Sequence, residues 1–464
     1  MTSLVVRDVE IEGRAGLDVR IVDGRIAEIG PRLAHRGEAL EGRGGALIPS
    51  LVDHHIHLFA LAAQAESLSL EGVASAAAFK ARIEAALAAR PVGRWLRVTG
   101  YHEAMGGELD RAGLDAIAPS HPIRVQHQTG SLWVLNSLAL AAVGAEAATS
   151  PSVERDAAGL PTGCIWRGDA WLRERLADAP PSLAAVGAQL AAFGITAVTD
   201  ASVTTDAGGA ALLAKAHRAG ELPQRLTLMS GGALAAPADG AFTVGPVKVL
   251  LDDHDLPPLD DFVAWIRRAR SWGRPVATHC VTASELALTL AALQSAGARP
   301  GDRIEHGGVI PAEAVTVIRA LGLTVVTQPA FVLERGDRYL AEVDAAEQDD
   351  LYRCASLLAA GVPVAASSDA PYASPDPWRG IATAIQRRTL GGQPLGLSEQ
   401  VAAADALAMY LGSPGSPGAA PRRVEVGAIA DLCLLKTPLR DVLAAPAAEC
   451  VAATLIGGRS VYQA

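Results

Sequence analysis

Cysteine is scarce in this chain, and its spacing argues against two kinds of scaffold. The five cysteines among 464 residues are an odd number, lie far apart and include no Cys-x-x-Cys pair. Disulfide frameworks and thiolate metal clusters both need closely spaced cysteines. We therefore expect neither, and the composition favours a reducing compartment such as the cytoplasm.

The chain also lacks a basic block and a long apolar run. Forty basic side chains stand against fifty acidic ones, a net charge of −10, which argues against a nucleic-acid or anionic-membrane partner. No run approaches the roughly eighteen apolar residues of a membrane helix, and the first residues do not resemble a signal peptide. We expect a small-molecule substrate as the partner, with a homodimer as the default assembly.

The length and composition predict a large folded core. At roughly 150 residues per domain, 464 residues suggest three ordinary domains or one barrel with an accessory domain. Hydrophobic residues make up 50% of the chain, which excludes disorder. Short segments of alternating polarity occur at both ends, at 4–9, 17–22 and 25–29 and again at 429–435 and 451–456. We predict that residues 1–49 and 411–464 together build a small β-sandwich.

Between these ends, short apolar runs alternate with Ala- and Leu-rich helical segments at 183–193, 259–272, 284–296 and 312–321. This rhythm predicts an α/β fold with a parallel sheet. We interpret residues 50–410 as a (β/α)₈ TIM barrel with an insertion after its first strand, at about 93–182, that carries strand candidates of its own at 95–100 and 123–126. The eight predicted barrel strands are 46–52, 195–199, 226–230, 247–251, 276–279, 303–306, 323–327 and 362–367. An open doubly wound sheet is the alternative.

The sharpest local motif is His-x-His at the end of the first predicted barrel strand. Residues i and i+2 of a strand project to the same face, so the imidazoles of His55 and His57 can converge on one metal ion. A triplet of this kind also arises by chance in roughly a quarter of chains with this many histidines. The motif alone is therefore a weak signal.

Four later strands end in further residues of the ligand type, namely Lys248, His279, His306 and Asp369. In (β/α)₈ enzymes the active site lies at this carboxyl-terminal rim. Imidazoles with a carboxylate suit zinc or a related divalent ion. Each residue has an ordinary alternative: a core position for His279, a solvent-facing strand end for Lys248, and a turn before Pro371 for Asp369.

Lysine is rare enough to make Lys248 informative. Only four of the forty basic residues are lysines, so a lysine kept between valines suggests chemistry that a guanidinium group cannot perform. Burial lowers the pKa of a lysine and favours the neutral amine, which can react with carbon dioxide to give a carbamate. We hypothesise that Lys248 is carboxylated at Nζ and bridges two metal ions.

The set His55, His57, Lys248, His279, His306 and Asp369 resembles the metal ligands of the amidohydrolase superfamily. The motifs at 95–101, 114–119, 136–140, 159–163, 194–200, 303–306 and 368–371 resemble its YtcJ-like branch, which includes N-substituted formamide deformylase. The resemblance implies that His55 and His57 bind one ion, that His279 and His306 bind a second, and that carboxylated Lys248 bridges them. Asp369 would be the last ligand and the general base. The implied activity is hydrolysis of a carbon–nitrogen bond in an amide, formamide or cyclic amide, with zinc as the expected metal and one or two ions per chain.

The insertion departs from the branch where substrate contacts are expected. The branch commonly shows Gly-His shortly before Asn-Ser-x-Ala-Leu, whereas Gly130 is followed here by Ser131, and the nearest histidine is His127. We note His127, His102 and Trp133 as candidate substrate-binding residues, although surface or packing roles are the more common explanation for such residues.

Two other functions compete with amide hydrolysis. The first is a deaminase of a heterocyclic amine with a single metal ion, but such enzymes carry a glutamate three residues after the histidine of the fifth strand, where this chain has Thr282. The second is an inert barrel that acts as a binding protein, because fold alone does not guarantee catalysis. The complete set of six ligand-type residues argues against the second alternative.

Overall fold

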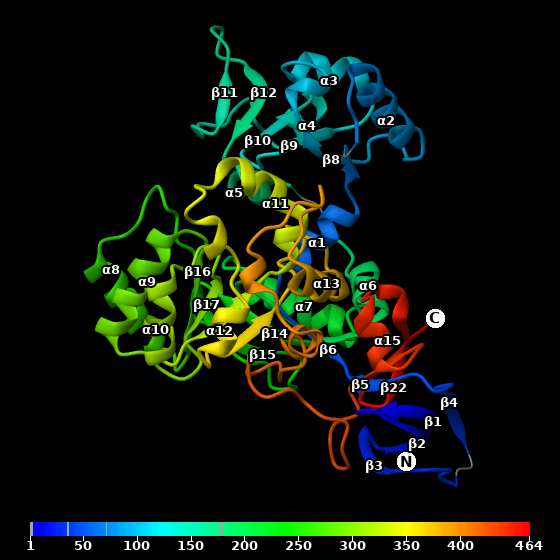
Figure 1. Ribbon diagram of the computed structural model, residues 1–464. Coiled ribbons are helices and arrows are strands. Elements are labelled where there is room, and N and C mark those ends of the chain that lie inside the picture. The colour runs from blue at the N-terminus through cyan, green and yellow to red at the C-terminus, as the bar shows by residue number, and fades with distance from the viewer. Residues whose placement is uncertain (1–2, 35–36, 71, 177–179) are drawn as a thin grey trace. The chain divides into compact units, whose positions relative to one another are not determined.

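Eight parallel strands form one sheet within the part of the chain that the computed structural model describes, residues 3–34, 37–70, 72–176 and 180–464 (Figure 1). Each strand overlaps one of the eight predicted from the sequence, so the predicted barrel is confirmed. In sheet order the strands are β19 (Val364–Ala366), β18 (Thr324–Thr327), β17 (Arg303–His306), β16 (Val276–Cys280), β15 (Thr243–Val249), β14 (Arg225–Ser230), β13 (Ile195–Asp200) and β6 (Leu51–Ile56).

The seam between β6 and β19 is bridged by other segments of the chain. Met409 and Tyr410 lie between the two strands: the carbonyl of Met409 accepts from the amide of Ala366 at 3.0 Å, and that of Tyr410 accepts from the amide of Val52 at 2.9 Å. At the carboxyl ends of the strands, the amide of Asp369 donates to the carbonyl of His55 at 2.8 Å. The backbones of these two residues are therefore joined directly.

Helices cover the outside of the barrel, as α8, α9 and α10 do beside β16 and β17 (Figure 1). Their starts follow from local sequence: Thr282 and Glu285 form a reciprocal capping box at the start of α9, and Asp376 caps α13, which begins with Pro377. The four helices predicted from the sequence are confirmed. The helices of this part are α6 (Ala184–Ala192), α7 (Ala207–Arg218), α8 (Leu259–Ser271), α9 (Ala283–Ala296), α10 (Ala312–Ala320), α11 (Ala330–Glu342), α12 (Ala355–Ala359), α13 (Pro377–Gln386), α14 (Ala403–Ala408) and α15 (Leu439–Ala444).

Two four-stranded sheets, built from the two ends of the described chain, share one apolar core. Side chains from the amino-terminal strands, such as Val6 and Ile21, pack in the same cluster as Leu434 and Leu455 from the carboxyl-terminal strands. This arrangement confirms the predicted β-sandwich. The first sheet has the order β3 (Arg25–Gly30), β2 (Arg14–Val22), β1 (Ser3–Ile11) and β4 (Glu38–Glu41), and the second β22 (Arg459–Gln463), β21 (Val451–Ile456), β20 (Leu432–Leu435) and β5 (Leu47–Pro49).

A second compact unit, Phe59–Ser182, is separate from the unit formed by Met1–Leu58 and Leu183–Ala464. It contains the predicted insertion at 93–182 and begins earlier, because Phe79 of α2 packs in the core of its sheet with Leu96. Its sheet order is β11 (Val153–Arg155), β12 (Pro161–Trp166), β10 (Leu132–Leu135), β9 (Ile123–His127), β8 (Leu96–Tyr101) and β7 (Leu68–Ser69). Its helices are α1 (Leu58–Ala65), α2 (Ala76–Ala88), α3 (Arg111–Ile117), α4 (Ser137–Ala142) and α5 (Asp169–Arg175).

Among the helices of the described residues, none is both long and apolar enough to cross a membrane.

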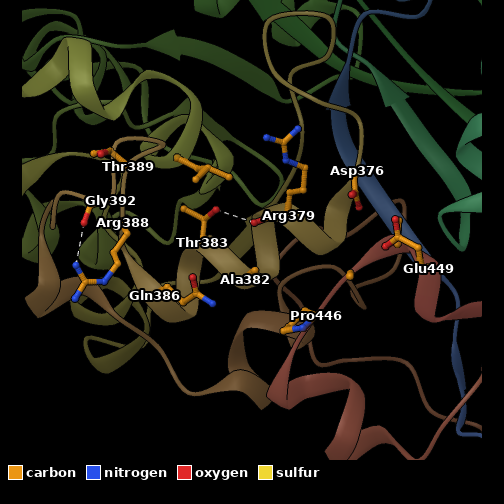
Figure 2. Close-up of a pocket in the computed structure, with 13 residues that line it drawn as sticks. Asp376, Arg379, Ala382, Thr383, Gln386, Arg388, Thr389, Gly392, Pro446 and Glu449 are labelled. Atoms are coloured by element: carbon orange, nitrogen blue, oxygen red, sulfur yellow. Dashed lines mark hydrogen bonds between the residues drawn. The ribbon is translucent and has the colours of Figure 1, made fainter.

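A cavity of about 490 Å³ lies beside α13, between that helix and the segment at 446–449 (Figure 2). Both arginines on its wall are engaged within the protein: Arg379 pairs with Glu334 at 3.4 Å, and Arg388 donates to the carbonyl of Gly392 at 3.0 Å. None of the six predicted metal ligands lines this cavity.

Candidate metal centre

The six predicted metal ligands all lie at the carboxyl-terminal rim of the barrel, and we call them the metal cluster. His55 is in β6 and His57 directly follows it, while Asp369 comes three residues after β19. The other three lie in neighbouring strands: Lys248 in β15, His279 in β16 and His306 at the end of β17. Parallel strands bring their carboxyl ends to the same rim, which is where barrel enzymes build their sites.

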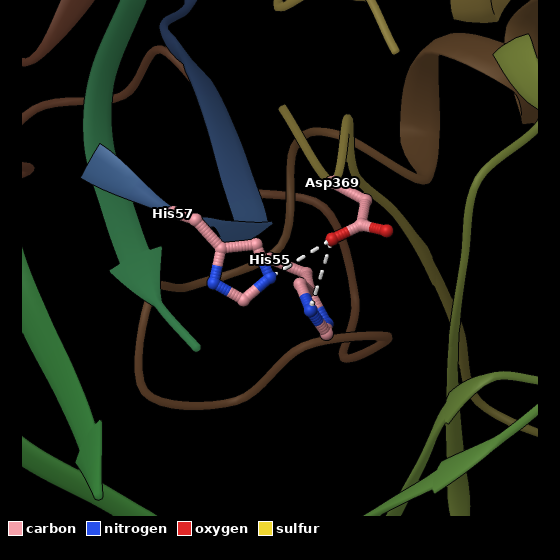
Figure 3. Close-up of side chains that lie close together, drawn as sticks. All are labelled: His55, His57 and Asp369. Carbon is pink, nitrogen blue, oxygen red and sulfur yellow. Dashed lines mark ion pairs between the residues drawn. The ribbon is translucent and has the colours of Figure 1, made fainter. Parts of the chain in front are cut away.

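Three members of the metal cluster already have the spacing of a metal site. The Nε2 atoms of His55 and His57 lie 3.3 and 3.1 Å from the same oxygen of Asp369, Oδ1 (Figure 3). One ligand atom from each of the three residues falls within 4.8 Å of the other two. Within the described part of the chain, His55 Nε2 and Asp369 Oδ1 have no hydrogen-bond partner although they are buried. Unpaired buried acceptors around one point are what a cation would satisfy.

The Nδ1 atoms of three histidines in the metal cluster, His55, His57 and His306, each contact a neighbouring oxygen atom. His57 Nδ1 lies 3.0 Å from the hydroxyl of Ser202, and His306 Nδ1 lies 2.8 Å from the side-chain oxygen of Gln328. His55 Nδ1 contacts a carboxylate oxygen of Glu305. When Nδ1 carries the proton and donates it to such a group, the lone pair of Nε2 faces the site. In that tautomer the Nε2 atoms of His55, His57 and His306 could each bind a metal.

Glu305 belongs to the site although the sequence analysis did not assign it a role. Its side chain is fully buried and also accepts a hydrogen bond from Arg303 Nε, and Arg303 donates further to the carbonyl of His54 at 3.1 Å. Arg303 and Glu305 are two apart on β17, so they share a face of the strand. An arginine and a glutamate at this spacing in a fully buried strand are a signal for a buried ion pair.

The second half of the metal cluster is formed by His279, His306 and Lys248. The rings of His279 and His306 lie 4.5 Å apart, and the rings of His306 and His55 lie 4.7 Å apart, which connects the two halves. Lys248 is only 3% exposed, and no described residue forms a hydrogen bond with its Nζ. An ammonium group buried in this way is costly unless it is neutralised or modified.

Burial disfavours the charged forms of Lys248 and of three of the histidines. It lowers the pKa of Lys248, although the carboxylates of Glu305 and Asp369 oppose the shift. It also lowers the pKa of His279 to about 3, with the positive charge of Lys248 acting in the same direction. Burial holds the pKa values of His55 and His306 well below the usual range. At neutral pH these imidazoles are therefore uncharged and can donate a lone pair.

The backbone around Asp369 is fixed by a buried carboxyl group. Asp53 Oδ1 accepts from the amides of His55 and Ser368, each at 3.1 Å, and Asp53 Oδ2 lies 2.5 Å from the hydroxyl of Ser368. Burial raises the pKa of Asp53 to about 6, against the lowering effect of these hydrogen bonds. Asp369 itself has a φ of +56° and His306 a φ of +71°, the left-handed region that non-glycine residues seldom adopt. Such backbone strain is typical of functional sites.

The three candidate substrate-binding residues lie in the unit Phe59–Ser182. The ring of His102 stacks on that of His127 at 6.0 Å, and His127 Nε2 is 3.1 Å from a carboxylate oxygen of Glu103. Trp133 is buried in β10, and the guanidinium of Arg97 lies 5.4 Å from its ring centre. The structure thus brings His102 and His127 together with Glu103 but leaves Trp133 in a packed core. Their role in substrate binding stays a prediction.

Comparison with known proteins identifies the family of the chain. The model of the amidohydrolase family matches residues 40–462. The chain is 26% identical to N-substituted formamide deformylase of Arthrobacter pascens, over 93% of this chain and 92% of that protein. It is 23% identical to the putative amidohydrolase YtcJ of Bacillus subtilis, over 85% of this chain and 83% of that protein. The fold matches that of an uncharacterised metal-dependent hydrolase from Pyrococcus horikoshii, with a TM-score of 0.77, 19% identity and coverage of 99% of this chain and 100% of that one. The protein therefore belongs to the amidohydrolase family of hydrolytic enzymes.

Proposed function

We propose that this enzyme hydrolyses a carbon–nitrogen bond in an amide, formamide or cyclic amide of a small molecule, with Asp369 as the general base. The observation that carries the proposal is the convergence of two Nε2 atoms on one carboxylate oxygen of Asp369, at 3.3 and 3.1 Å. Its relative from Arthrobacter pascens is named for deformylation of N-substituted formamides, which supports a carbon–nitrogen bond as the target.

The metal cluster divides into two sets of ligands for divalent ions, with zinc as the expected metal. His55 and His57 would hold one ion together with Asp369, and His279 and His306 would hold a second. A bound divalent ion supplies Lewis-acid chemistry, because it lowers the pKa of water and polarises a carbonyl group. The donor set fits such ions, since neutral imidazole and carboxylate are borderline-hard ligands.

Lys248 is proposed to bridge the two sets after carboxylation. The lone pair of its neutral amine attacks the carbon of carbon dioxide, a nitrogen–carbon bond forms, and one nitrogen-bound proton leaves to solvent. The lowered pKa and the burial of Lys248 favour the amine form. The resulting carbamate replaces an unpaired positive charge with an anion that offers two oxygen ligands.

Asp369 is placed to move a proton between water and the leaving group. Its amide is held by the carbonyl of His55 at 2.8 Å, so its carboxylate keeps a fixed position at the mouth of the barrel. In the proposed reaction the carboxylate takes a proton from the attacking water and passes it to the nitrogen of the leaving amine as the carbon–nitrogen bond breaks. Fixing donor and acceptor in this way lowers the entropic part of the barrier.

The deaminase alternative has less support. The position that would carry its glutamate is Thr282, whose side chain caps α9 by accepting from the amide of Glu285 at 3.2 Å. The carboxylate of Glu285 is itself engaged by the amides of Val281 and Thr282, at 2.6 and 3.0 Å. Both side chains therefore serve the start of the helix.

The test is a hydrolysis screen with zinc-loaded enzyme and its Asp369→Asn variant, with amine release measured on N-formyl, N-acyl and cyclic amides. We expect the wild-type enzyme to cleave members of at least one class, and the variant to turn over slower by about 10²–10⁴-fold, the usual contribution of a general base. An Asp369→Asn variant with full activity would show that Asp369 is not the base. Deamination of heterocyclic amines without any amide cleavage would favour the alternative.

A further inference from the structure

Three exposed apolar side chains follow members of the metal cluster at the strand ends. They are Leu250, Val281 and Tyr372, with 59%, 37% and 58% of their surfaces exposed. Single exposed apolar residues are common and need no explanation. These three differ because each lies two or three residues beyond a metal-cluster residue. We call them the apolar rim.

Two members of the apolar rim stand above neighbouring strands. Leu250 comes two residues after Lys248, and Val281 comes two residues after His279. Leu250 directly follows β15 and Val281 directly follows β16, so both lie at the carboxyl ends of these strands, at the mouth of the barrel. β15 and β16 are paired in parallel, with Lys248 beside Ala277. Leu250 and Val281 therefore belong to the same part of the rim.

Tyr372 stands on the opposite side of the mouth. Its ring lies edge-on to the ring of His57, 5.7 Å away at an interplanar angle of 86°. Its backbone is fixed, because its amide donates to the carbonyl of Asp369 at 2.9 Å and its carbonyl accepts from Arg335 at 2.6 Å. In the sheet order, β6 and β19 flank the seam while β15 and β16 lie in the middle. A molecule bound at the metal cluster would sit between Tyr372 and the other two residues.

Exposed carboxylates beside Leu250 and Val281 disfavour an anionic group on that side of the rim. The loop after β15 carries Asp252, Asp253 and Asp255, all of them exposed. The side chain of Asp253 lies 2.9 Å from the hydroxyl of Thr282, which ties this loop to the residue that follows Val281. A carboxylate on the substrate would meet like charges here, whereas an uncharged apolar group would bury surface without an electrostatic penalty.

We propose that the apolar rim is the subsite for an uncharged apolar substituent of the substrate, next to the bond that is cleaved. This inference rests on the proposed function, because it takes the metal cluster as the place where that bond is held. The substrate class is then an amide with an alkyl or aryl substituent that lies between Tyr372 on one side and Leu250 and Val281 on the other.

The test measures the affinity of zinc-loaded protein for three hydroxamates that share one metal-binding head group. Acetohydroxamate has a short chain, hexanohydroxamate a long apolar chain, and the monohydroxamate of succinic acid a chain that ends in a carboxylate. Each buried methylene should tighten binding about fourfold, so we expect hexanohydroxamate to bind at least about tenfold more tightly than acetohydroxamate. We expect the succinate derivative to bind no more tightly than acetohydroxamate.

Substitutions then locate the preference. Leu250→Ser, Val281→Ser and Tyr372→Ala should each reduce the ratio between hexano- and acetohydroxamate, and the three together should bring it to within about threefold. Leu390→Ser is the matched control, because Leu390 is 72% exposed and lies outside the metal cluster and the rim. We expect this control to keep the wild-type ratio.

The outcomes separate the subsite from the proposed function. If zinc-loaded protein binds both hydroxamates equally, or if the control lowers the ratio as much as the rim variants do, the subsite is refuted while the metal centre stands. If neither hydroxamate binds and no zinc is retained, the proposed function is refuted and the subsite with it. The rim residues are exposed, and the circular dichroism spectrum of each variant checks that it has folded.

Discussion

Glu305→Gln is the substitution that tests most closely how the protein orients His55, a proposed metal ligand. The wild-type carboxylate accepts from His55 Nδ1 through one oxygen and from Arg303 Nε through the other. An amide has only one acceptor oxygen. If that oxygen serves Arg303, the NH₂ group faces His55 Nδ1 and favours a proton on Nε2, which is the wrong tautomer for a ligand. If the oxygen serves His55 instead, the NH₂ group faces the N–H of Arg303, and two hydrogen-bond donors then oppose each other.

The expected effect is large enough to measure in two ways. Loss of the group that orients a metal-binding histidine lowers metal affinity by about 10- to 100-fold, or about 1.4–2.7 kcal/mol. The metal-free protein should also unfold more easily, because both Glu305 and Arg303 are buried and damage to a buried ion pair costs up to about 3–5 kcal/mol. Zinc affinity is read by competition with a chromophoric chelator, and stability by urea unfolding of the metal-free protein.

Glu399→Gln separates the two effects. Glu399 is also buried and also pairs with an arginine, Arg353, at 2.7 Å, but among the described residues it forms no hydrogen bond or ion pair with a histidine. We expect this control to destabilise the protein while leaving zinc affinity within about twofold of wild type, in line with the additivity of distant sites. If Glu305→Gln bound zinc as tightly as Glu399→Gln does, the proposed role of Glu305 would be wrong.

Three further predictions follow from the same contacts. Zinc at 100 times its dissociation constant should stabilise the wild-type protein by about 2.7 kcal/mol, seen as a higher melting temperature in differential scanning calorimetry. His55→Ala should abolish both this stabilisation and the activity, and a variant that zinc still stabilises would place the metal elsewhere. Lys248→Met should lower the zinc content, measured by elemental analysis, to at most one ion per chain, and two ions per chain would rule out a bridging role. The same substitution should not destabilise the metal-free protein, because it removes a buried ammonium that has no hydrogen-bond partner among the described residues. Thr282→Ala should destabilise the protein by about 1 kcal/mol in urea unfolding, because it removes the cap of α9, and an unchanged unfolding midpoint would show that this cap contributes little.

The barrel and the positions of the six ligand-type residues at its rim could be predicted because the relevant signals are local. Strand alternation places His55 and His57 on one face, and the parallel arrangement brings the ends of later strands to the same rim. The rarity of lysine pointed to Lys248, which proves to be buried. Each of these inferences needs only a short stretch of sequence and a rule about the fold.

The orienting contacts could not be predicted because they depend on distances across the barrel. Glu305 and His55 are 250 residues apart in sequence, and Ser202 and His57 are 145 apart. No local pattern says which carboxylate meets which imidazole. The bridging of the seam by Met409 and Tyr410 likewise depends on a segment that shows no strand pattern. The early start of the unit Phe59–Ser182 follows from the packing of α2, which is also a tertiary contact.

The central claim is that the side chains at the rim of the barrel hold a divalent ion. Anomalous diffraction at the zinc edge, from crystals of the zinc-loaded protein, tests this claim most directly. We predict a strong peak about 2.0–2.1 Å from the Nε2 atoms of both His55 and His57, with Asp369 among its ligands. A zinc-loaded crystal whose peaks all lie away from these three residues would contradict the account.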